Sequence, residues 1–330
     1  MKKLLILDGN SVLHRAYYAL PDWRNRSGEA TAGVYGFLSM LLKAIEELKP
    51  THLAIVFDTP QSTFRHNMYV GYQSNREKDR QISEDIWGQV DKLRIVFEKM
   101  GVPVFSVEGL EADDVIGTIA KQAISQYLTP GPSPKLGEGN QTEEVVIITG
   151  DRDLMQLVND RVKLYMPQKG LSDGKIIDRD GVMEKLGVWP EQVIDYKALV
   201  GDPSDNYPGV TGIGPKTATK LLEEFGTFEK IYESLNTSPV LRAPSPNLGE
   251  GTLKKLVNGY EGGELSKRLA TMKDDCPITF KIDECEVPSM DKFAEVFKEL
   301  GYKSLTKRVK GDNGGKGGEN INQVGLFERL

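Results

Sequence analysis

Acidic side chains follow several short apolar stretches of this sequence, at points where strands are expected to end. They are Asp8, Asp58, Glu111, Asp113, Asp114, Asp151 and Asp153. In an open parallel α/β sheet, ligands bind in the crevice outside the carboxyl ends of the strands. Acids gathered there repel one another unless divalent cations lie between them. The pattern therefore predicts a carboxylate metal site at one edge of a sheet.

A second acidic pair, Asp202 and Asp205, lies in the later half of the chain. A single aspartate after a strand is as often a helix cap or a turn former, so each acid alone carries little weight. The chain has only 3 histidines and 2 cysteines, so a site built on oxygen ligands is indicated, which suits Mg²⁺ or Mn²⁺. Two such ions can activate a water, orient a phosphodiester and stabilise the leaving oxygen. We therefore expect two Mg²⁺ or Mn²⁺ ions and phosphodiester hydrolysis.

A glycine-rich loop, PGVTGIGPKT, occupies residues 208–217. Its glycines let the backbone approach a phosphate, and amide groups at the start of the next helix would face that phosphate. Contacts of this type position a duplex without reading its sequence. The alternative interpretation is an ordinary Gly/Pro turn between two helices.

Five segments carry specific motifs: LLILDGNSVLHRAYYAL, LAIVFDTPQSTFRHNMYVGYQSNRE, EGLEADDVIGTIA, IITGDRDLMQLV and GDPSDNYPGVTGIGPKTATKLLEEFG. In this order they resemble the bacterial 5′→3′ exonuclease family, the nuclease unit at the front of DNA polymerase I, which is akin to the flap endonucleases. The resemblance implies an α/β fold with a mostly parallel sheet covered by helices (a PIN/FEN-like core), followed by a helical subdomain with a helix–two-turn–helix DNA-binding motif. It also implies a structure-specific 5′ nuclease that acts as exonuclease and flap endonuclease in primer removal and DNA repair.

The resemblance assigns roles to the acids. Ligands of the first metal ion would be Asp8, Asp58, Glu111, Asp113 and Asp114, and ligands of the second would be Asp151, Asp153, Asp202 and Asp205, with Asp113 near both. The implied catalytic set is Asp8, Asp58, Asp113 and Arg76.

The resemblance also assigns the DNA contacts. They are Arg65, Tyr72, Gln73, Arg76 and Lys78 in an arch at about 61–90, and Gly209, Gly212, Gly214, Lys216 and Thr217 in the helix–two-turn–helix at about 199–226. Tyr72 would stack on a base, and the family often holds K⁺ at the helix–two-turn–helix. The alternative for the arch is a solvated charged loop.

One position departs from the family pattern. The family usually has a lysine directly after this tyrosine, and this chain has Gln73. Either Arg76 or Lys78 supplies the positive charge, or the chain is a catalytically weakened protein that binds flap and junction DNA. A small RNA-cutting nuclease is disfavoured, because such enzymes lack the long helical half and the glycine-rich loop.

Alternating strands and helices must position the acids in the first half. We expect strands ending at Asp8 and at 52–58, 102–107 and 144–149, with helices at 33–48, before Gly101 and at 115–127. From about residue 180 the chain is mainly helical, with Pro190 in the first turn of a helix ending at Val200 and helices at 217–225, 228–235, 252–258, 264–273 and 292–300. Such alternation implies a mostly parallel sheet covered on both faces.

The expected domains are an α/β core at 1–166, a helical subdomain at 167–309 and a flexible Gly-rich tail at 310–330. Two nearly identical octapeptides, PSPKLGEG and PSPNLGEG, indicate loop insertions at about 129–142 and 242–252, which surface loops tolerate well. In the tail, Gln323, Leu326 and Phe327 resemble the Q-x-x-L-F peptide that binds the sliding clamp; an incidental Leu-Phe is the alternative.

The composition sets few further limits. The net charge of −6 decides little about DNA, because basic patches act locally. We expect a cytoplasmic monomer without a membrane segment, because no apolar run is long enough to span a bilayer and the first residues lead directly into a strand. The chain ends soon after the nuclease unit, so we also expect no polymerase on it.

Overall fold

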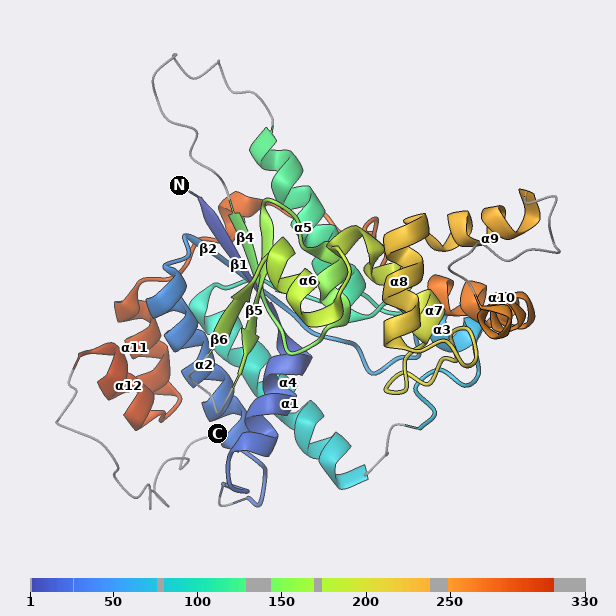
Figure 1. The fold of residues 1–330 in the computed structure, drawn as a ribbon. Helices are drawn as coiled ribbons and strands as arrows, with labels where there is room; N and C mark the ends of the chain where they lie inside the picture. Colours follow the sequence, from blue (N-terminus) through green and yellow to red (C-terminus); the bar gives the residue numbers. More distant parts are fainter. Residues whose placement is uncertain are drawn as a thin grey trace, which may run out of the picture.

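One six-stranded sheet forms the centre of the first half (Figure 1). The structure, a computed structural model, describes residues 2–25, 27–75, 80–128, 144–168, 174–237 and 249–311. The strands are β1 (Lys3–Asp8), β2 (His52–Val56), β3 (Val104–Phe105), β4 (Glu144–Ile148), β5 (Val162–Pro167) and β6 (Gly174–Ile177), in the order β3-β2-β1-β4-β5-β6. The first five are parallel and β6 pairs antiparallel with β5. The expected mostly parallel sheet is confirmed.

The central strand β1 is buried on both faces. Leu4 and Ile6 pack into one apolar cluster, and Leu5 and Leu7 pack into another. This split follows from the period of two along a strand. A strand with no polar face is typical of a parallel sheet covered by helices on both sides.

Helices cover each face of the sheet. One face carries α1 (Gly9–Ala19), α2 (Ala32–Leu48), α4 (Arg80–Met100), α11 (Met290–Glu299) and α12 (Lys303–Val309); the other carries α5 (Ala112–Leu128) and α6 (Arg179–Leu186). The short α3 (Phe64–Met68) follows β2. Because α11 and α12 come from the end of the chain, the first-half core is completed by late residues (Figure 1).

The helical part lies beyond α5 and α6 in Figure 1. It contains the 3-10 turn η2 (Pro190–Gln192), α7 (Val193–Val200), α8 (Pro215–Phe225), α9 (Phe228–Thr237) and α10 (Glu250–Ala270). The expectation of separate helices at 252–258 and 264–273 was wrong, because α10 runs unbroken through Gly262 and Gly263. A Cβ at Gly262 would lie 2.7 Å from the carbonyl oxygen of Gly209, so these glycines permit close packing instead of ending the helix.

Six other elements differ from expectation. The strand expected at 102–107 contains only β3, α4 begins inside the expected arch, and β5, β6, α6 and α12 were not predicted. Strand β6 lies beyond residue 166, so the sheet continues past the expected end of the core. The division into domains therefore stays a proposal, and we propose a boundary after β6.

Several expectations fall outside the described residues. They concern Arg76 and Lys78, the first insertion, and the tail with Gln323, Leu326 and Phe327. Of the second insertion, the last residues are described and form the first turn of α10.

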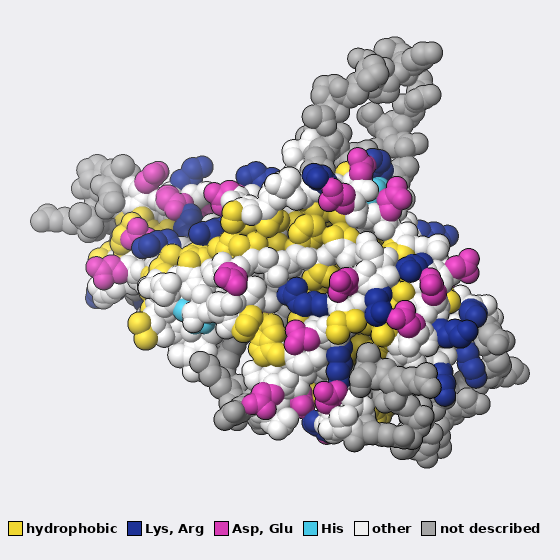
Figure 2. All heavy atoms as spheres, turned by 180° about the vertical axis from the view of Figure 1, so that it is seen from behind, with side chains coloured by type: hydrophobic (Ala, Val, Ile, Leu, Met, Phe, Trp, Pro, Cys, Tyr) yellow, Lys and Arg dark blue, Asp and Glu magenta, His cyan; other side chains and the backbone are white. Residues whose placement is uncertain are grey.

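None of the described helices is both long and apolar enough to span a membrane. On the face seen in Figure 2, basic and acidic side chains are interspersed, so the net negative charge does not form one acidic area there.

Candidate metal centre and nucleic-acid interface

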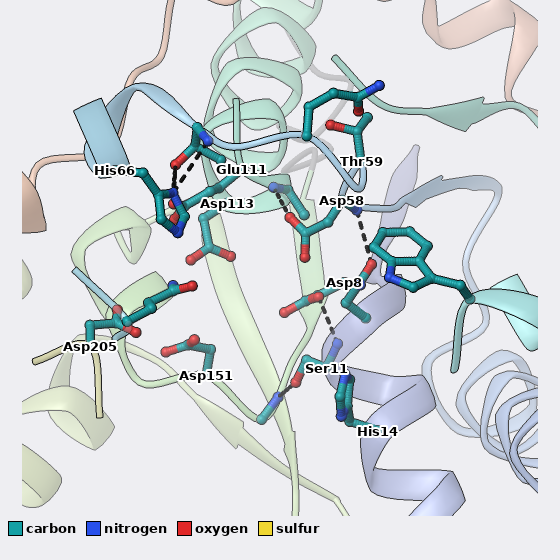
Figure 3. A pocket seen from close by; sticks show the side chains of 17 residues that line it. Asp8, Ser11, His14, Asp58, Thr59, His66, Glu111, Asp113, Asp151 and Asp205 are labelled. Carbon is teal, nitrogen blue, oxygen red and sulfur yellow. Dashed lines mark hydrogen bonds between the residues drawn. The ribbon is translucent and has the colours of Figure 1, made fainter. Parts of the chain in front are cut away.

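A pocket of about 540 Å³ lies at the carboxyl edge of the sheet. Its acidic lining consists of Asp8, Asp58, Glu111, Asp113, Asp151 and Asp205. These side chains come from the ends of β1 and β2, the start of α5, the segment after β4 and the loop after α7 (Figure 3). The parallel strands thus deliver their terminal acids to one volume, as the sequence predicts for a doubly covered sheet.

Asp8 ends β1 and caps α1. Its Oδ1 accepts a hydrogen bond from the Ser11 amide at 3.0 Å, and its Oδ2 accepts one from the Thr149 hydroxyl at 2.7 Å. The pKa of the Asp8 carboxyl is raised to about 7, mainly by burial; the nearby charges of Asp58 and Asp151 act in the same direction, and the two hydrogen bonds act against it. The carboxyl is therefore fixed in place and poorly solvated, which favours a bound cation.

Asp58, which follows β2, and Asp113, the second residue of α5, both lie at the start of this helix. The Oδ1 atom of Asp58 accepts a hydrogen bond of 2.7 Å from the amide of Ala112, the first residue of this helix. Burial raises the pKa of Asp113 well above its ordinary value, and the charges of the surrounding carboxylates act in the same direction. Because the ionised carboxylates repel one another, bound protons or cations must offset this repulsion.

Glu111 is held by two hydroxyl groups. Its Oε1 accepts a hydrogen bond from Thr63 at 2.8 Å, and its Oε2 accepts one from Tyr72 at 3.1 Å. Burial raises the pKa of Glu111, and the Arg65 guanidinium acts in the opposite direction. Both donors come from the segment around α3, so this segment orients one of the pocket's acids.

A second acidic group adjoins the pocket. Carboxylate oxygens of Asp153, Asp202 and Asp205 lie within 4.8 Å of one another. Burial raises the pKa of Asp153 to about 7. Burial also opposes ionisation of Asp202, yet hydrogen bonds from Lys197 and Ser204 outweigh it and lower the pKa of Asp202. Asp205 belongs to both groups, so the two groups of acids are continuous.

Arg65 and Asp114 lie away from the roles expected for them. Arg65 is 3% exposed and Asp114 is 0% exposed, and two guanidinium nitrogens of Arg65 each donate a hydrogen bond of 2.8 Å to the Asp114 carboxylate. Arg65 also donates to the carbonyl oxygens of Leu269 and Thr271, at the end of α10. We therefore assign this pair a structural role: it joins α3 and α5 to α10, in place of the DNA contact and the metal ligand that were expected.

Tyr72 and Gln73 face the acids. Tyr72 is 4% exposed, and its hydroxyl bonds Glu111 and Asp205. In this arrangement its ring offers no free face for the expected base stacking. Gln73 lines the pocket. Among the residues described as lining the pocket, none is lysine or arginine.

The glycine-rich loop joins α7 to α8. Gly209 has φ +61° and a Cβ there would lie 2.2 Å from the amide nitrogen of Gly201, so this glycine is needed for packing. Gly212 accepts a hydrogen bond from Lys255, and Gly214 precedes the first turn of α8. Lys216 is exposed and Thr217 is half-buried in that first turn. The start of α8 is thus accessible to an anion, in agreement with helix N-terminus chemistry.

Comparison with known families decides the family of this chain. A model described as the 5′-3′ exonuclease N-terminal resolvase-like domain matches residues 3–187, and one described as the 5′-3′ exonuclease C-terminal SAM fold matches residues 188–293. The chain belongs to the 5′→3′ exonuclease family.

Two relatives of this 5′→3′ exonuclease family member are DNA polymerases I. The protein from Bacillus caldotenax is 37% identical over 311 residues, and that from Bacillus subtilis (strain 168) is 36% identical over 315 residues. Each alignment covers 94% of this chain but only 32% and 33% of the respective relative. The chain thus spans about a third of the length of these relatives.

Solved structures share the fold. T5 5′-exonuclease, with divalent zinc ions bound, gives a TM-score of 0.64 at 21% identity and covers 94% of this chain and 99% of its own. The catalytic core of Rad2 in complex with DNA substrate gives a TM-score of 0.57 at 17% identity and covers 93% of this chain and 92% of its own. The 5′→3′ exonuclease fold therefore extends over nearly the whole chain.

The pocket of this exonuclease-family chain also contains side chains that the sequence did not single out. His14, His66 and Trp87 line it, and Lys197 bonds Asp153 and Asp202 beside it. His14 lies in the second turn of the helix that Asp8 caps, and Lys197 precedes Asp202 by five residues, so proximity to a predicted acid is the signal that could have found both. Trp87 comes from the distant α4, and the sequence carries no local signal for it.

Proposed function

We propose that this chain is a divalent-metal-dependent, structure-specific 5′ nuclease that hydrolyses DNA phosphodiesters at flaps, nicks and single-strand/duplex junctions. The observation that carries the proposal is the convergence of six acids in one pocket at the carboxyl edge of the sheet. Membership of the 5′→3′ exonuclease family supports it. The role we propose is primer removal in replication and DNA repair, because the relatives named above are DNA polymerases I.

The donor atoms fit hard divalent cations. The acidic groups supply carboxylate oxygens, and burial raises the pKa of four acids within them, Asp8, Glu111, Asp113 and Asp153. Desolvated carboxylates gain most from a cation that replaces their protons. We propose Mg²⁺ or Mn²⁺ ions held by Asp8, Asp58, Glu111 and Asp113 on one side, and by Asp151, Asp153, Asp202 and Asp205 on the other. Such ions would activate a water and stabilise the leaving oxygen.

The chain's own residues orient this chemistry. Thr149 and Ser11 fix both oxygens of Asp8, and Ala112 fixes one oxygen of Asp58. Preset geometry of this kind lowers the cost of reaching the transition state. The exposed first turn of α8, with Lys216, would hold a backbone phosphate of the duplex, and we propose the adjoining glycine-rich loop for K⁺.

A second candidate function rests on Gln73. A neutral amide lines the pocket where the family usually has a lysine, and none of the residues described as lining it is lysine or arginine. The chain would then bind flap and junction DNA with little cleavage. The two candidates differ in one respect: in the nuclease, Arg76 or Lys78 supplies the missing positive charge, and in the binding protein neither does.

Cleavage of a labelled 5′-flap duplex with Mg²⁺ tests the proposal. We expect Asp113→Ala to lower the rate by roughly 10³-fold or more, because the pocket loses a central carboxylate. Asp160→Ala is the matched control, since Asp160 is exposed at the amino end of β5, on the opposite edge of the sheet. Equal rates for the parent and Asp113→Ala would refute the enzyme proposal. Tight binding of flap DNA without cleavage would favour the second candidate.

Cellular location, assembly and other partners stay proposals. We propose a cytoplasmic monomer whose tail binds a sliding clamp through Gln323, Leu326 and Phe327. The support for the clamp is the sequence pattern of the tail alone.

A further inference from the structure

Two segments far apart in the chain are tied together above the pocket. We call the contact between the turn 71–75 and the loop 202–206 the arch-base contact. The amide of Gln73 donates to the carbonyl oxygen of Asp205 at 2.8 Å. The side-chain amide of Asn206 donates to Gly71 O and to Ser74 Oγ, each at 2.8 Å, and that of Asn75 donates to Pro203 O at 2.6 Å. Each segment thus donates a side-chain amide to a backbone carbonyl oxygen of the other.

The backbone is unusual on both sides of this contact. Gln73 has φ +52° and Asn206 has φ +56°, and among the described residues only one other non-glycine residue, Lys49, has a positive φ. A left-handed conformation costs free energy for a residue with a side chain, and asparagine tolerates it better than glutamine. Such strain persists only where surrounding contacts hold it, and here the hydrogen bonds of the arch-base contact do so.

The arch-base contact reaches the acids of both groups. The Tyr72 hydroxyl lies 3.1 Å from Glu111 Oε2 and 3.4 Å from Asp205 Oδ2. Gln73, the next residue, lines the pocket. Movement of the turn 71–75 therefore changes the surroundings of Glu111 and Asp205 together.

We propose that Asn206 is a positioning residue for the nuclease site: its amide holds the turn 71–75 on the loop 202–206, so that Tyr72, Gln73 and Asp205 move as one unit. The proposal rests on the proposed function for its catalytic consequence. Asn206 itself does not touch the reacting atoms. It acts through Asp205, which precedes it, and through the turn that it binds.

Hydrogen exchange of the full chain tests the contact directly, with and without Mg²⁺. In the Asn206→Gly variant, the left-handed backbone is easier to form but the amide is lost. We expect exchange in the peptide containing Gln73 to become about tenfold faster, because local opening is no longer opposed by the amide. Exchange in β4 should stay unchanged, which shows that the fold is intact. Unchanged exchange at Gln73 would overturn the proposal.

Catalysis and metal binding provide two further measurements. For Asn206→Gly and Asn75→Ala we expect kcat on flap DNA to fall about tenfold with little change in KM, the pattern of an interaction that matters in the transition state. Mn²⁺ affinity of the protein without DNA, measured by electron paramagnetic resonance, should fall by about tenfold, as for other residues that orient ligands. Asn159→Ala is the control, because Asn159 also stabilises a turn by accepting from Arg161 N at 2.9 Å, away from the pocket.

These measurements separate the two proposals. If the parent does not cut flap DNA, the proposed function fails, while the exchange and Mn²⁺ measurements still test Asn206. If the parent cuts flap DNA and Asn206→Gly matches it in kcat and Mn²⁺ affinity, the positioning role is wrong and the proposed function stands.

Discussion

At the scale of single residues, the buried acids bind protons more tightly than free carboxyls do. Burial raises the pKa of Asp8 and of Asp153 to about 7. A group whose pKa is raised by folding stabilises the folded state while protonated, and this stability is lost as the pH rises through the folded-state pKa. The ionised acids therefore lower the stability of the folded state at neutral pH unless cations replace the protons.

The pH dependence of thermal unfolding follows from this sign. Without metal, we expect the Tm to fall as the pH rises from about 4, near the ordinary pKa of these carboxyls, to about 7, the raised pKa of Asp8 and Asp153. Mg²⁺ or Mn²⁺ should raise the Tm more at the higher pH, because fewer protons then compete for the carboxylates. Calorimetry with and without metal measures both effects, and Asp8→Asn should flatten the metal-free slope. A metal-free Tm that rises over this range would contradict the argument.

Gln73 gives a prediction about charge. We expect Gln73→Lys to raise kcat on flap DNA by about tenfold, because a cation near the scissile phosphate stabilises developing negative charge. Lysine tolerates this backbone, since Lys49 has a similar positive φ of 48°. Gln73→Met supplies a side chain of similar length without charge and should stay near the parent. A lower rate for Gln73→Lys than for Gln73→Met would show that positive charge is not limiting.

Sequence reasoning found the acids of the pocket for a physical reason. Parallel strands end at one edge, so Asp8 and Asp151 can be grouped from strand positions alone. The burial of Arg65 and Tyr72 could not be predicted, because a charged segment in the sequence resembles a solvated loop. Only packing against the end of α10, distant in the sequence, converts Arg65 into an internal ion-pair partner.

At the scale of elements, α10 shows how glycine can serve packing inside a helix. Its two glycines at 262 and 263 suggest a break when the sequence is considered alone. In the structure they face the loop 208–210 and the ring of Phe228 at distances too short for a Cβ. The helix thus supports the loop proposed to bind the duplex, and no local rule of helix propensity could predict this.

Paired glycine substitutions test this account. We expect Gly262→Ala to lower the free energy of unfolding by about 1–3 kcal/mol, because the new Cβ would meet the backbone of Gly209. Gly251→Ala lies in the first turn of the same helix, where a Cβ meets nothing within 4 Å, and should raise stability by up to about 1 kcal/mol. Urea unfolding measures both. Equal effects of the two substitutions would mean that packing at Gly262 is unimportant.

At the scale of the whole molecule, one buried ion pair joins the α/β core to the helical part. Arg65 follows β2, Asp114 begins α5, and the remaining donors of Arg65 bond the end of α10. The Lys273 amide adds a hydrogen bond of 2.8 Å to Asp114. Together with the arch-base contact, these bonds connect the segment after β2 to the second half, and they fix where the arch begins relative to the helical part.

Substitution of one partner of the Arg65–Asp114 pair should lower the free energy of unfolding more than substitution of both. We expect Arg65→Met to destabilise the protein by about 3–5 kcal/mol, because it leaves the Asp114 charge buried without compensation. The double variant Arg65→Met/Asp114→Leu should recover a large part of this loss. Denaturant unfolding of the two variants decides. A double variant less stable than Arg65→Met would show that the pair stabilises the fold in its own right.

The last helices have a consequence for biosynthesis. Phe293 and Phe297 of α11 and Leu305 of α12 complete the apolar cluster on one face of the sheet, and the amide of Leu53 in β2 donates to the carbonyl oxygen of Cys285. During translation this cluster stays incomplete until α11 and α12 have left the ribosome. Domains whose cores need late residues expose apolar surface while they are synthesised. The nascent chain should therefore depend on chaperone holding until α11 and α12 dock.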